Sequence, residues 1–241
     1  MIRQNMPILI KHIVDTENKS IEDIFTQKGR IYTFLNPVSY LTALKNKFIF
    51  GEFDGIFADG SILVIAIKLF YRKKVTRRSF DMTSLAPKLL RYAEKNKKTI
   101  YIVASQQEQI EKAVTFFKEK YPDILFTGYR NGYFSSDIEM EKEAENIAKV
   151  NPDLLIVGMG TLMQEKFLIK VKSKGYQGIG FTCGGFIHQS TKDKLEYYPI
   201  WINKLNLRFI YRMYKEKHTR KRYLQAAILF PIKFILEYFY R

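Results

Sequence analysis

Apolar and polar residues alternate along the chain in blocks whose lengths fit the strands and helices of an α/β protein. The clearest block is Leu154–Val157, four apolar residues after Asn151-Pro152-Asp153, which predicts a short strand buried on both faces, as in a parallel sheet. Gly158 and Gly160 end this run, and apolar residues at helical spacing then predict an amphipathic helix that reaches Gly175. The stretch therefore predicts a strand, a glycine turn and a helix.

The same alternation continues on both sides of this stretch. Other strands are predicted at Ile8–Val14, Arg30–Leu35, Phe53–Ala58, Thr99–Val103, Ile124–Thr127 and Gly178–Phe181. Helices are predicted after Ser20 and at Val38–Lys47, Ile62–Tyr71, Ser84–Lys95, Gln106–Lys120 and Ile138–Lys149, with a basic connector at 73–78 and a loop at 128–134. Because strand and helix patterns follow one another repeatedly, we expect an α/β fold with a largely parallel sheet and helices on both faces.

The pattern changes after about residue 195. Residues 200–241 hold ten Lys or Arg against two acids, so they carry half of the net charge of +16, and aromatic residues are interleaved among them. A basic segment followed by the apolar helix Tyr223–Tyr240 is typical of an amphipathic element that lies in a membrane interface. Lys233, Glu237 and Pro231 argue against a helix that spans the membrane. We therefore divide the chain into a core, residues 1–195, and a helical membrane-binding appendage, residues 196–241.

Two alternatives for the appendage stay open. Its helices could pack on the core and expose a solvated basic face. The basic residues could also bind nucleic acid. No recognisable DNA-binding or RNA-binding motif accompanies them, however, and we expect no nucleic-acid partner.

Composition limits the class of protein. With 241 residues and 46% hydrophobic residues, the chain can bury a full core. The net charge of +16 indicates an anionic partner, such as nucleotide phosphates or an acidic membrane surface. Cys183 is the only cysteine, so the chain forms no intramolecular disulfide and a reducing cytoplasm is expected. No uncharged apolar segment is long enough for a membrane span, and the N-terminus does not resemble a signal peptide.

Few residues are candidates for chemistry. Asp59 follows the strand predicted at Phe53–Ala58, at the edge where α/β folds place ligands, although an Asp there could equally cap the next helix. The turn at Gly158 and Gly160 would point backbone N–H groups at a phosphate, or it could be a tight turn without a ligand. Polar residues at 164–166, on the first turn of the following helix, favour a ligand.

Metal chemistry has little support in the sequence. It contains no D-x-D, no H-E-x-x-H and no cluster of Cys or His, so we expect no metal site and no cofactor. An anion would have to be neutralised by Arg, Lys and backbone N–H groups. His188 and Cys183 are expected to be a loop residue and a structural residue.

Several short motifs together resemble one family. They are Phe34-Leu35-Asn36-Pro37, Ala58-Asp59-Gly60, Gly128–Phe134, Val157–Lys166, Cys183–Phe186, Pro199-Ile200-Trp201 and Phe209–Arg212. In this order and spacing they are similar to those of the bacterial WecG/TagA/CpsF glycosyltransferases, which include N-acetylmannosaminyltransferases. The resemblance implies a Rossmann-like core and a C-terminal appendage that completes the site at the membrane.

The resemblance also implies the reaction and its partners. The reaction would be an inverting, metal-independent transfer of a hexose from a UDP-sugar to a polyprenyl-diphosphate-linked sugar. It would take place on an anionic membrane surface, at the cytoplasmic face of the cell membrane. The oligomeric state is left open, a homo-oligomer included.

The matched motifs also imply roles for single residues. Asp59 aligns with the proposed catalytic base, Gln164 with an active-site glutamine and Arg212 with the first arginine of the appendage, whereas Arg220 and Arg222 match later arginines only loosely. Further substrate-binding positions are Asn36, Gly60, Tyr133, Gly158, Gly160 and Gly185. The chain departs from the family pattern at Phe34 and at 78–83, which are expected to line the sugar pocket, so the identity of the donor sugar is open.

Two other classes of function remain as alternatives. A dinucleotide-binding oxidoreductase would need a third glycine, where this chain has Met163. A non-catalytic adaptor for membranes or nucleic acid would explain the basic tail but neither Asp59 nor Gln164.

Overall fold

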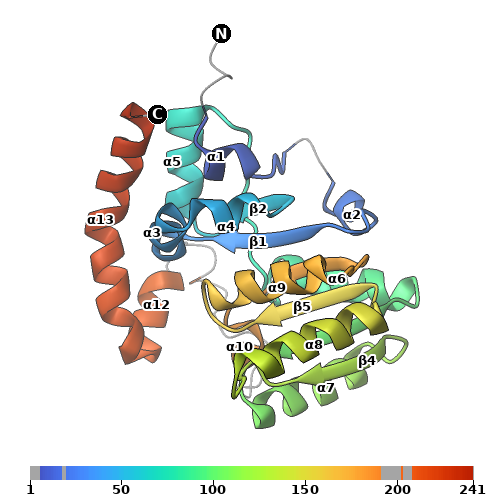
Figure 1. Ribbon diagram of the computed structural model, residues 1–241. Coiled ribbons are helices and arrows are strands. Elements are labelled where there is room, and N and C mark those ends of the chain that lie inside the picture. The colour runs from blue at the N-terminus through green and yellow to red at the C-terminus, as the bar shows by residue number, and fades with distance from the viewer. Residues whose placement is uncertain (1–5, 18–19, 191–201, 203–207, 241) are drawn as a thin grey trace.

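The computed structural model describes residues 6–17, 20–190, 202 and 208–240 (Figure 1). Six strands form one sheet in the order β2-β1-β6-β5-β3-β4, and every neighbouring pair is parallel. The strands are β1 (Ile31–Leu35), β2 (Gly55–Ala58), β3 (Thr99–Ala104), β4 (Leu125–Arg130), β5 (Leu154–Gly158) and β6 (Ile179–Thr182). The parallel sheet and the Rossmann-like α/β fold expected from the sequence are confirmed.

Helices cover both faces of the sheet. They are α1 (Ile8–His12), α2 (Ile21–Ile24), α3 (Pro37–Lys45), α4 (Lys47–Gly51), α5 (Ser61–Tyr71), α6 (Leu85–Lys95), α7 (Gln107–Lys120), α8 (Asp137–Val150), α9 (Met163–Ser173), α10 (Phe186–Ser190), α12 (Arg208–Lys215), the 3-10 helix η1 (Lys217–Thr219) and α13 (Arg220–Phe239). Adjacent residues of β3 point to opposite faces of the sheet. Ile102 packs with α6 and α7 on one face, whereas Val103 packs with α8 and α9 on the other.

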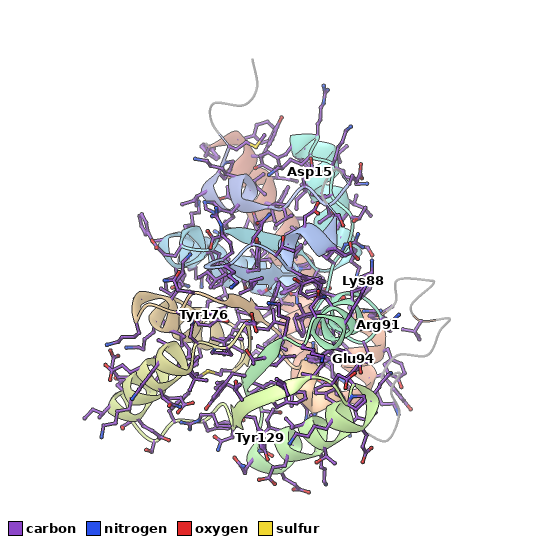
Figure 2. All side chains as sticks on the ribbon, turned by 90° about the vertical axis from the view of Figure 1, so that its right-hand side faces the viewer. Asp15, Lys88, Arg91, Glu94, Tyr129 and Tyr176 are labelled. Atoms are coloured by element: carbon purple, nitrogen blue, oxygen red, sulfur yellow. The ribbon has the colours of Figure 1, made fainter. Side chains whose placement is uncertain are left out.

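Helix α6 illustrates why these segments fold as helices. Its apolar residues recur at helical spacing, so that Leu85 and Leu89 are buried against the sheet. Lys88 and Arg91 lie on the opposite, exposed side of the helix (Figure 2). The amphipathic pattern therefore fixes which side of the helix faces the core.

The strand predicted at Ile8–Val14 is wrong. The segment forms α1, followed by a single parallel bridge between Ile13 and Ile56 of β2. Its adjacent residues Leu9 and Ile10 are both fully buried, and an apolar run without strict alternation fits a buried helix as well as a strand. Lys73 Nζ, from the basic connector, donates to the carbonyl oxygens of Ile10 and Ile13 at 2.8 and 2.9 Å and so satisfies the end of this short helix.

Several element boundaries also differ from the prediction, among them the following three. The helix expected at Val38–Lys47 is interrupted at Asn46, which separates α3 from α4. Strand β4 continues to Arg130, into the stretch expected to be a loop, because its backbone pairs with β3 as far as Val103. Strand β2 begins at Gly55, two residues later than expected.

Helix α13 lies beside α3 and α5 and packs on them through aromatic side chains (Figure 1). Phe230 and Phe234 are buried, and both rings contact Tyr40 of α3. Tyr40 Oη donates a 2.6 Å hydrogen bond to Glu237, which also pairs with Lys47 at 2.8 Å. One face of the helix thus belongs to the core, while the boundary predicted at residues 195 and 196 lies outside the described residues. Within the described ranges, no helix is long and apolar enough to cross a membrane.

Candidate active site

The carboxyl ends of β1, β2 and β6 open into a cavity of about 640 Å³ that α5, α12 and α13 close from the other side. Six residues predicted from the sequence line this cavity: Asn36, Asp59, Gly60, Gln164, Gly185 and Arg212. They come from segments that are far apart in the chain, and the parallel sheet brings them to one edge, as expected for ligand sites of α/β folds.

Asp59 follows the last residue of β2, and its backbone N–H donates to the carbonyl oxygen of Leu35 at 2.7 Å. The helix-capping alternative is wrong, because the N-cap of α5 is Gly60, with no side-chain cap. Gly60 has φ of 109°, a conformation that favours glycine. The Asp59 carboxyl group instead lines the cavity, with 31% of its side chain exposed.

Burial and neighbouring charges act in opposite directions on Asp59. Burial raises the pKa of Asp59 above its ordinary value. Arg77, whose Nη2 lies 3.4 Å from Asp59 Oδ1, lowers this pKa, as do Arg208 and Arg212, whereas Asp81 raises it. The net shift is upward, which is the direction expected for a carboxylate that accepts a proton during a reaction.

Arg77, Asp81 and Arg208 form a charged cluster at this cavity; Asp81 lines it as expected for the segment 78–83, whereas Arg77 and Arg208 were not predicted. Arg77 Nη2 donates to Ser79 Oγ at 2.8 Å and lies 3.5 Å from Asp81 Oδ2, which also accepts from Arg208 Nη1 at 2.6 Å. Although burial opposes ionisation, Arg208 and the hydroxyls of Ser79 and Thr83 hold the pKa of Asp81 below its ordinary value. For Arg77 and Arg208, the only signal in the sequence was their position in the basic connector and in the basic tail.

Arg212 approaches the cavity from α12. Its Nε donates to Glu216 Oε2 at 3.1 Å, an i, i+4 pair that orients the guanidinium. A Cβ added to Gly185 would lie 3.4 Å from Arg212 Nη2, so the guanidinium packs against the glycine turn that follows β6. Arg212 thus joins the appendage to the carboxyl edge of the sheet.

Gln164 is held by a buried polar network below the cavity. Its Oε1 accepts from the backbone N–H of Gly184 at 3.0 Å, and its Nε2 donates to Glu165 Oε1 at 2.8 Å. Glu165, which is 1% exposed, also accepts from Thr33 Oγ1 at 2.9 Å and from the backbone N–H of Leu162 at 2.6 Å. The polar stretch 164–166 was expected to face a ligand, but nothing in the sequence identified Glu165 as the residue that positions Gln164.

The glycine turn after β5 has a packing role. A Cβ on Gly158 would lie 2.6 Å from Cys183 Sγ and 2.8 Å from the carbonyl oxygen of Gly184, so only glycine lets β5 and the end of β6 approach. Gly160 has φ of 81°, and neither glycine lines the cavity, whereas Thr161 does. Phosphate binding by this turn stays a prediction.

Three other predicted residues lie away from this cavity. Tyr133 is 67% exposed, in the loop after β4. Arg220 is exposed at the start of α13, where its Nε donates to the carbonyl oxygen of Met213 at 2.9 Å. Arg222 lines a different cavity, between α3 and α13. These positions give no support for direct contact of the three residues with a ligand at Asp59.

Cys183 fits the structural role expected of it, whereas His188 does not lie in a loop as expected but in helix α10. Cys183 is buried, and burial raises the pKa of its thiol far above the ordinary value. His188 Nδ1 lies 2.8 Å from Gln109 Nε2. Among the residues that the structure describes, no group of three or more His, Cys, Asp or Glu side chains could hold a metal ion.

Comparison with known proteins relates the whole chain to one family. The model of the Glycosyl transferase WecG/TagA/CpsF family matches residues 7–241. The chain belongs to this family. The resemblance found in the sequence is thereby confirmed, and the protein is a glycosyltransferase with a Rossmann-like core.

Its relatives include enzymes with different named activities. A UDP-Gal:alpha-D-GlcNAc-diphosphoundecaprenol beta-1,4-galactosyltransferase of Shigella boydii is 34% identical over 207 residues, which cover 86% of each chain. An N-acetylglucosaminyldiphosphoundecaprenol N-acetyl-beta-D-mannosaminyltransferase of Bacillus subtilis is 26% identical over 200 residues, 81% of this chain and 75% of the relative. An enzyme of Staphylococcus aureus with the same name is 27% identical over 128 residues, 53% of this chain and 49% of the relative.

Proposed function

We propose that this WecG/TagA/CpsF glycosyltransferase moves a hexose, with inversion and without a metal ion, from a UDP-sugar to a sugar linked to polyprenyl diphosphate. The observation that carries the proposal is the cavity in which Asp59, with its raised pKa, faces Arg77 and Arg212 at the carboxyl edge of the sheet. One acid that can take a proton and several cations that can hold a diphosphate are what such a transfer needs.

In the proposed mechanism, Asp59 accepts the proton of the attacking hydroxyl of the acceptor sugar. The acceptor oxygen forms a bond to the anomeric carbon on the face opposite the departing UDP, and the bond from that carbon to the diphosphate oxygen breaks. Negative charge grows on the diphosphate as this bond breaks, so Arg77, Arg212 and the N-terminal turn of α5, which has no side-chain cap, would stabilise it.

The network below the cavity keeps the amide of Gln164 in place. Because Gly184 and Glu165 fix both ends of this amide, its orientation is set before a ligand binds. A preorganised polar group costs little reorganisation during the reaction. Gln164 would then contact the sugar or the phosphate next to Asp59.

The relatives suggest which substrates to test. The names of these three relatives all contain a GlcNAc linked to diphosphoundecaprenol. A polyprenyl-diphosphate-linked GlcNAc is therefore the acceptor that we propose. The relative with the higher identity uses UDP-Gal, whereas the others transfer N-acetylmannosamine. We therefore name UDP-galactose as the first donor to test and the N-acetylmannosamine donor as the second.

The apolar surface of α13 supports docking on the cytoplasmic face of the cell membrane. Leu224, Ile228, Ile232 and Phe239 are each more than half exposed, although the opposite face of the helix is packed on the core. Lys221, Arg222 and Lys233 are exposed on the same helix. Apolar residues flanked by basic ones favour an anionic interface.

The deciding experiment measures transfer. Purified protein would be incubated with each UDP-hexose and a GlcNAc-diphosphate-lipid, and the product and its anomeric configuration would be analysed by mass spectrometry and NMR. We expect one UDP-hexose to give a disaccharide-diphosphate-lipid with inverted configuration. Retained configuration, or transfer to free GlcNAc as fast as to the lipid-linked acceptor, would contradict the proposal.

A further inference from the structure

The cavity at Asp59 does not end at the charged residues. It continues as an apolar trench between α5 and α13, two helices that lie side by side (Figure 1). The trench is lined by Ile62, Ile65, Ala66, Leu69 and Phe70 of α5 and by Leu224, Ala227, Pro231, Phe234 and Ile235 of α13. The lining changes from charged to apolar along one continuous cavity.

The direction of α5 fixes how the trench relates to the site. The helix begins at Ser61, two residues after Asp59, and its 11 residues span about 16 Å at 1.5 Å per residue. Ile62, Ile65 and Leu69 are 52%, 62% and 71% exposed, so one stripe of α5 presents apolar side chains that the described residues leave uncovered. The trench therefore leads from the proposed base to an exposed apolar surface.

We propose that this trench holds the isoprenoid chain of the acceptor, next to its diphosphate. The inference rests on the proposed function, because it concerns the lipid end of the same acceptor. A ligand with a sugar and a diphosphate at one end and a hydrocarbon chain at the other matches the order of the lining: Asp59, Arg77 and Arg212 first, then ten apolar side chains.

Two other occupants fit the trench less well. A nucleotide sugar is polar along its whole length, and its polar groups would find no hydrogen-bond partners among these apolar side chains. Acyl chains of bulk membrane lipids would match the apolar part, but nothing in such a lipid would extend to Asp59. Continuity with the charged end therefore favours a chain that belongs to the substrate.

The test varies the length of the chain while the rest of the acceptor stays fixed. GlcNAc-diphosphate esters of a one-isoprene and a three-isoprene alcohol would be compared below their micelle concentrations, without membranes or detergent, so that membrane docking plays no part. The variant Ala227→Trp fills the trench. The matched control Ile228→Trp adds the same group to the neighbouring residue of α13, which is 65% exposed and lines neither cavity.

For the unaltered chain, we expect KM for the three-isoprene acceptor to be lower than that for the one-isoprene acceptor by roughly tenfold, the lower end of what an apolar group contributes in a pocket. Ala227→Trp should remove this difference without changing KM for the UDP-sugar or for the one-isoprene acceptor. Ile228→Trp should keep the difference. Equal KM values for the two acceptors in the unaltered chain, or an unchanged preference in Ala227→Trp, would overturn the inference.

A binding experiment separates failure of this inference from failure of the proposed function. A three-isoprene diphosphate that carries a benzophenone on its last unit would be photo-crosslinked to the protein, and the labelled peptides would be identified by mass spectrometry. Labelling of α5 and α13 that disappears in Ala227→Trp supports the trench even if no sugar is transferred. Labelling elsewhere, or labelling that persists in a folded Ala227→Trp protein, overturns it.

Discussion

Arg77 Nη2 lies 3.4 Å from Asp59 Oδ1, so the proposed base faces a cation and its pKa is nevertheless raised. Burial outweighs the guanidinium because Arg77 is shared with Asp81, 3.5 Å away, which itself opposes ionisation of Asp59. Because Arg77 contacts both Asp59 and Asp81, it can hold Asp59 in position without keeping it in the ionised form. The pair therefore leaves Asp59 able to exchange a proton.

Asp59→Asn should strongly lower turnover while leaving the binding of the UDP-sugar intact. The amide has the same shape but cannot accept a proton, and loss of a general base lowers kcat by ~10²-fold or more. Steady-state kinetics and isothermal titration with UDP would measure the two effects. Asp123→Asn, at an exposed position, is the control. Turnover within a few-fold of the unaltered protein would remove Asp59 from the mechanism.

Arg77→Gln should move the acid limb of the pH profile of kcat/KM to higher pH. Transfer needs the ionised carboxylate, so the rate falls as the pH falls through the pKa of Asp59. Arg77 favours the ionised form and lowers this pKa, and its removal raises the pKa further. A lower rate at every pH with an unmoved midpoint would show that Arg77 acts on the substrate alone. Lys112→Gln, in an exposed pair with Glu108, should leave the profile unchanged.

Local patterns explain which features could be predicted from the sequence. The stretch Leu154–Gly175 was predicted correctly as strand, turn and helix because its apolar spacing and its glycines lie within one short segment, although the helix is capped by Leu162. The strand predicted at Ile8–Val14 failed because burial there is decided by α4, β2 and Lys73, which are distant in the sequence. Long-range packing leaves no local signal of this kind.

For the candidate active site too, residues in local motifs could be predicted, whereas contacts between distant segments could not. Asp59 and Gln164 could be identified from short motifs that stand at the end of a strand and the start of a helix. The cluster of Arg77, Asp81 and Arg208 could not, since its members come from three segments and only the folded chain brings their charges within 4 Å. The trench between α5 and α13 depends on the pairing of two helices that are separated by more than a hundred residues.

Glu165→Gln should lower both stability and kcat. The new amide N–H₂ would replace an oxygen that accepts from Thr33, Gln164 or Leu162, so a buried donor would face another donor, at a cost of about 1 to 3 kcal/mol in the free energy of unfolding. If Glu165 positions Gln164, kcat should also be reduced when it is measured at temperatures well below the melting temperature. KM for the UDP-sugar should change little. Urea unfolding and kinetics would show both. Loss of stability with normal kcat would limit Glu165 to a structural role.

Transfer should survive removal of divalent cations. In the proposed mechanism, arginines and backbone N–H groups carry the charge of the leaving diphosphate, and no step uses a metal ion. Activity would be measured after dialysis against EDTA and again after Mg²⁺ or Mn²⁺ is added back. Activity that is lost to EDTA and restored by either ion would contradict metal independence.

Docking on anionic membranes should depend on the basic residues of α13. The double variant Lys221→Glu and Lys233→Glu reverses two exposed charges beside the apolar residues of that helix. Each basic residue near such a surface contributes roughly 1 kcal/mol, so the association constant for phosphatidylglycerol vesicles, measured by sedimentation, should fall by about tenfold or more at low salt. Raising the salt concentration should weaken binding of the unaltered protein in the same direction, because it screens the surface potential.

The control for docking is a double variant with the same net charge, in which the two reversed charges lie on another helix. Lys142→Glu with Lys149→Glu makes the same change on α8, which lies well apart from α13 (Figure 1). Since a field confined to about a Debye length acts only on nearby charges, this variant should sediment like the unaltered protein. Equal loss in both double variants would mean that the overall charge of the molecule, and no particular surface, attracts it to the membrane. The exposed apolar stripe of α13 would then need a partner other than lipid.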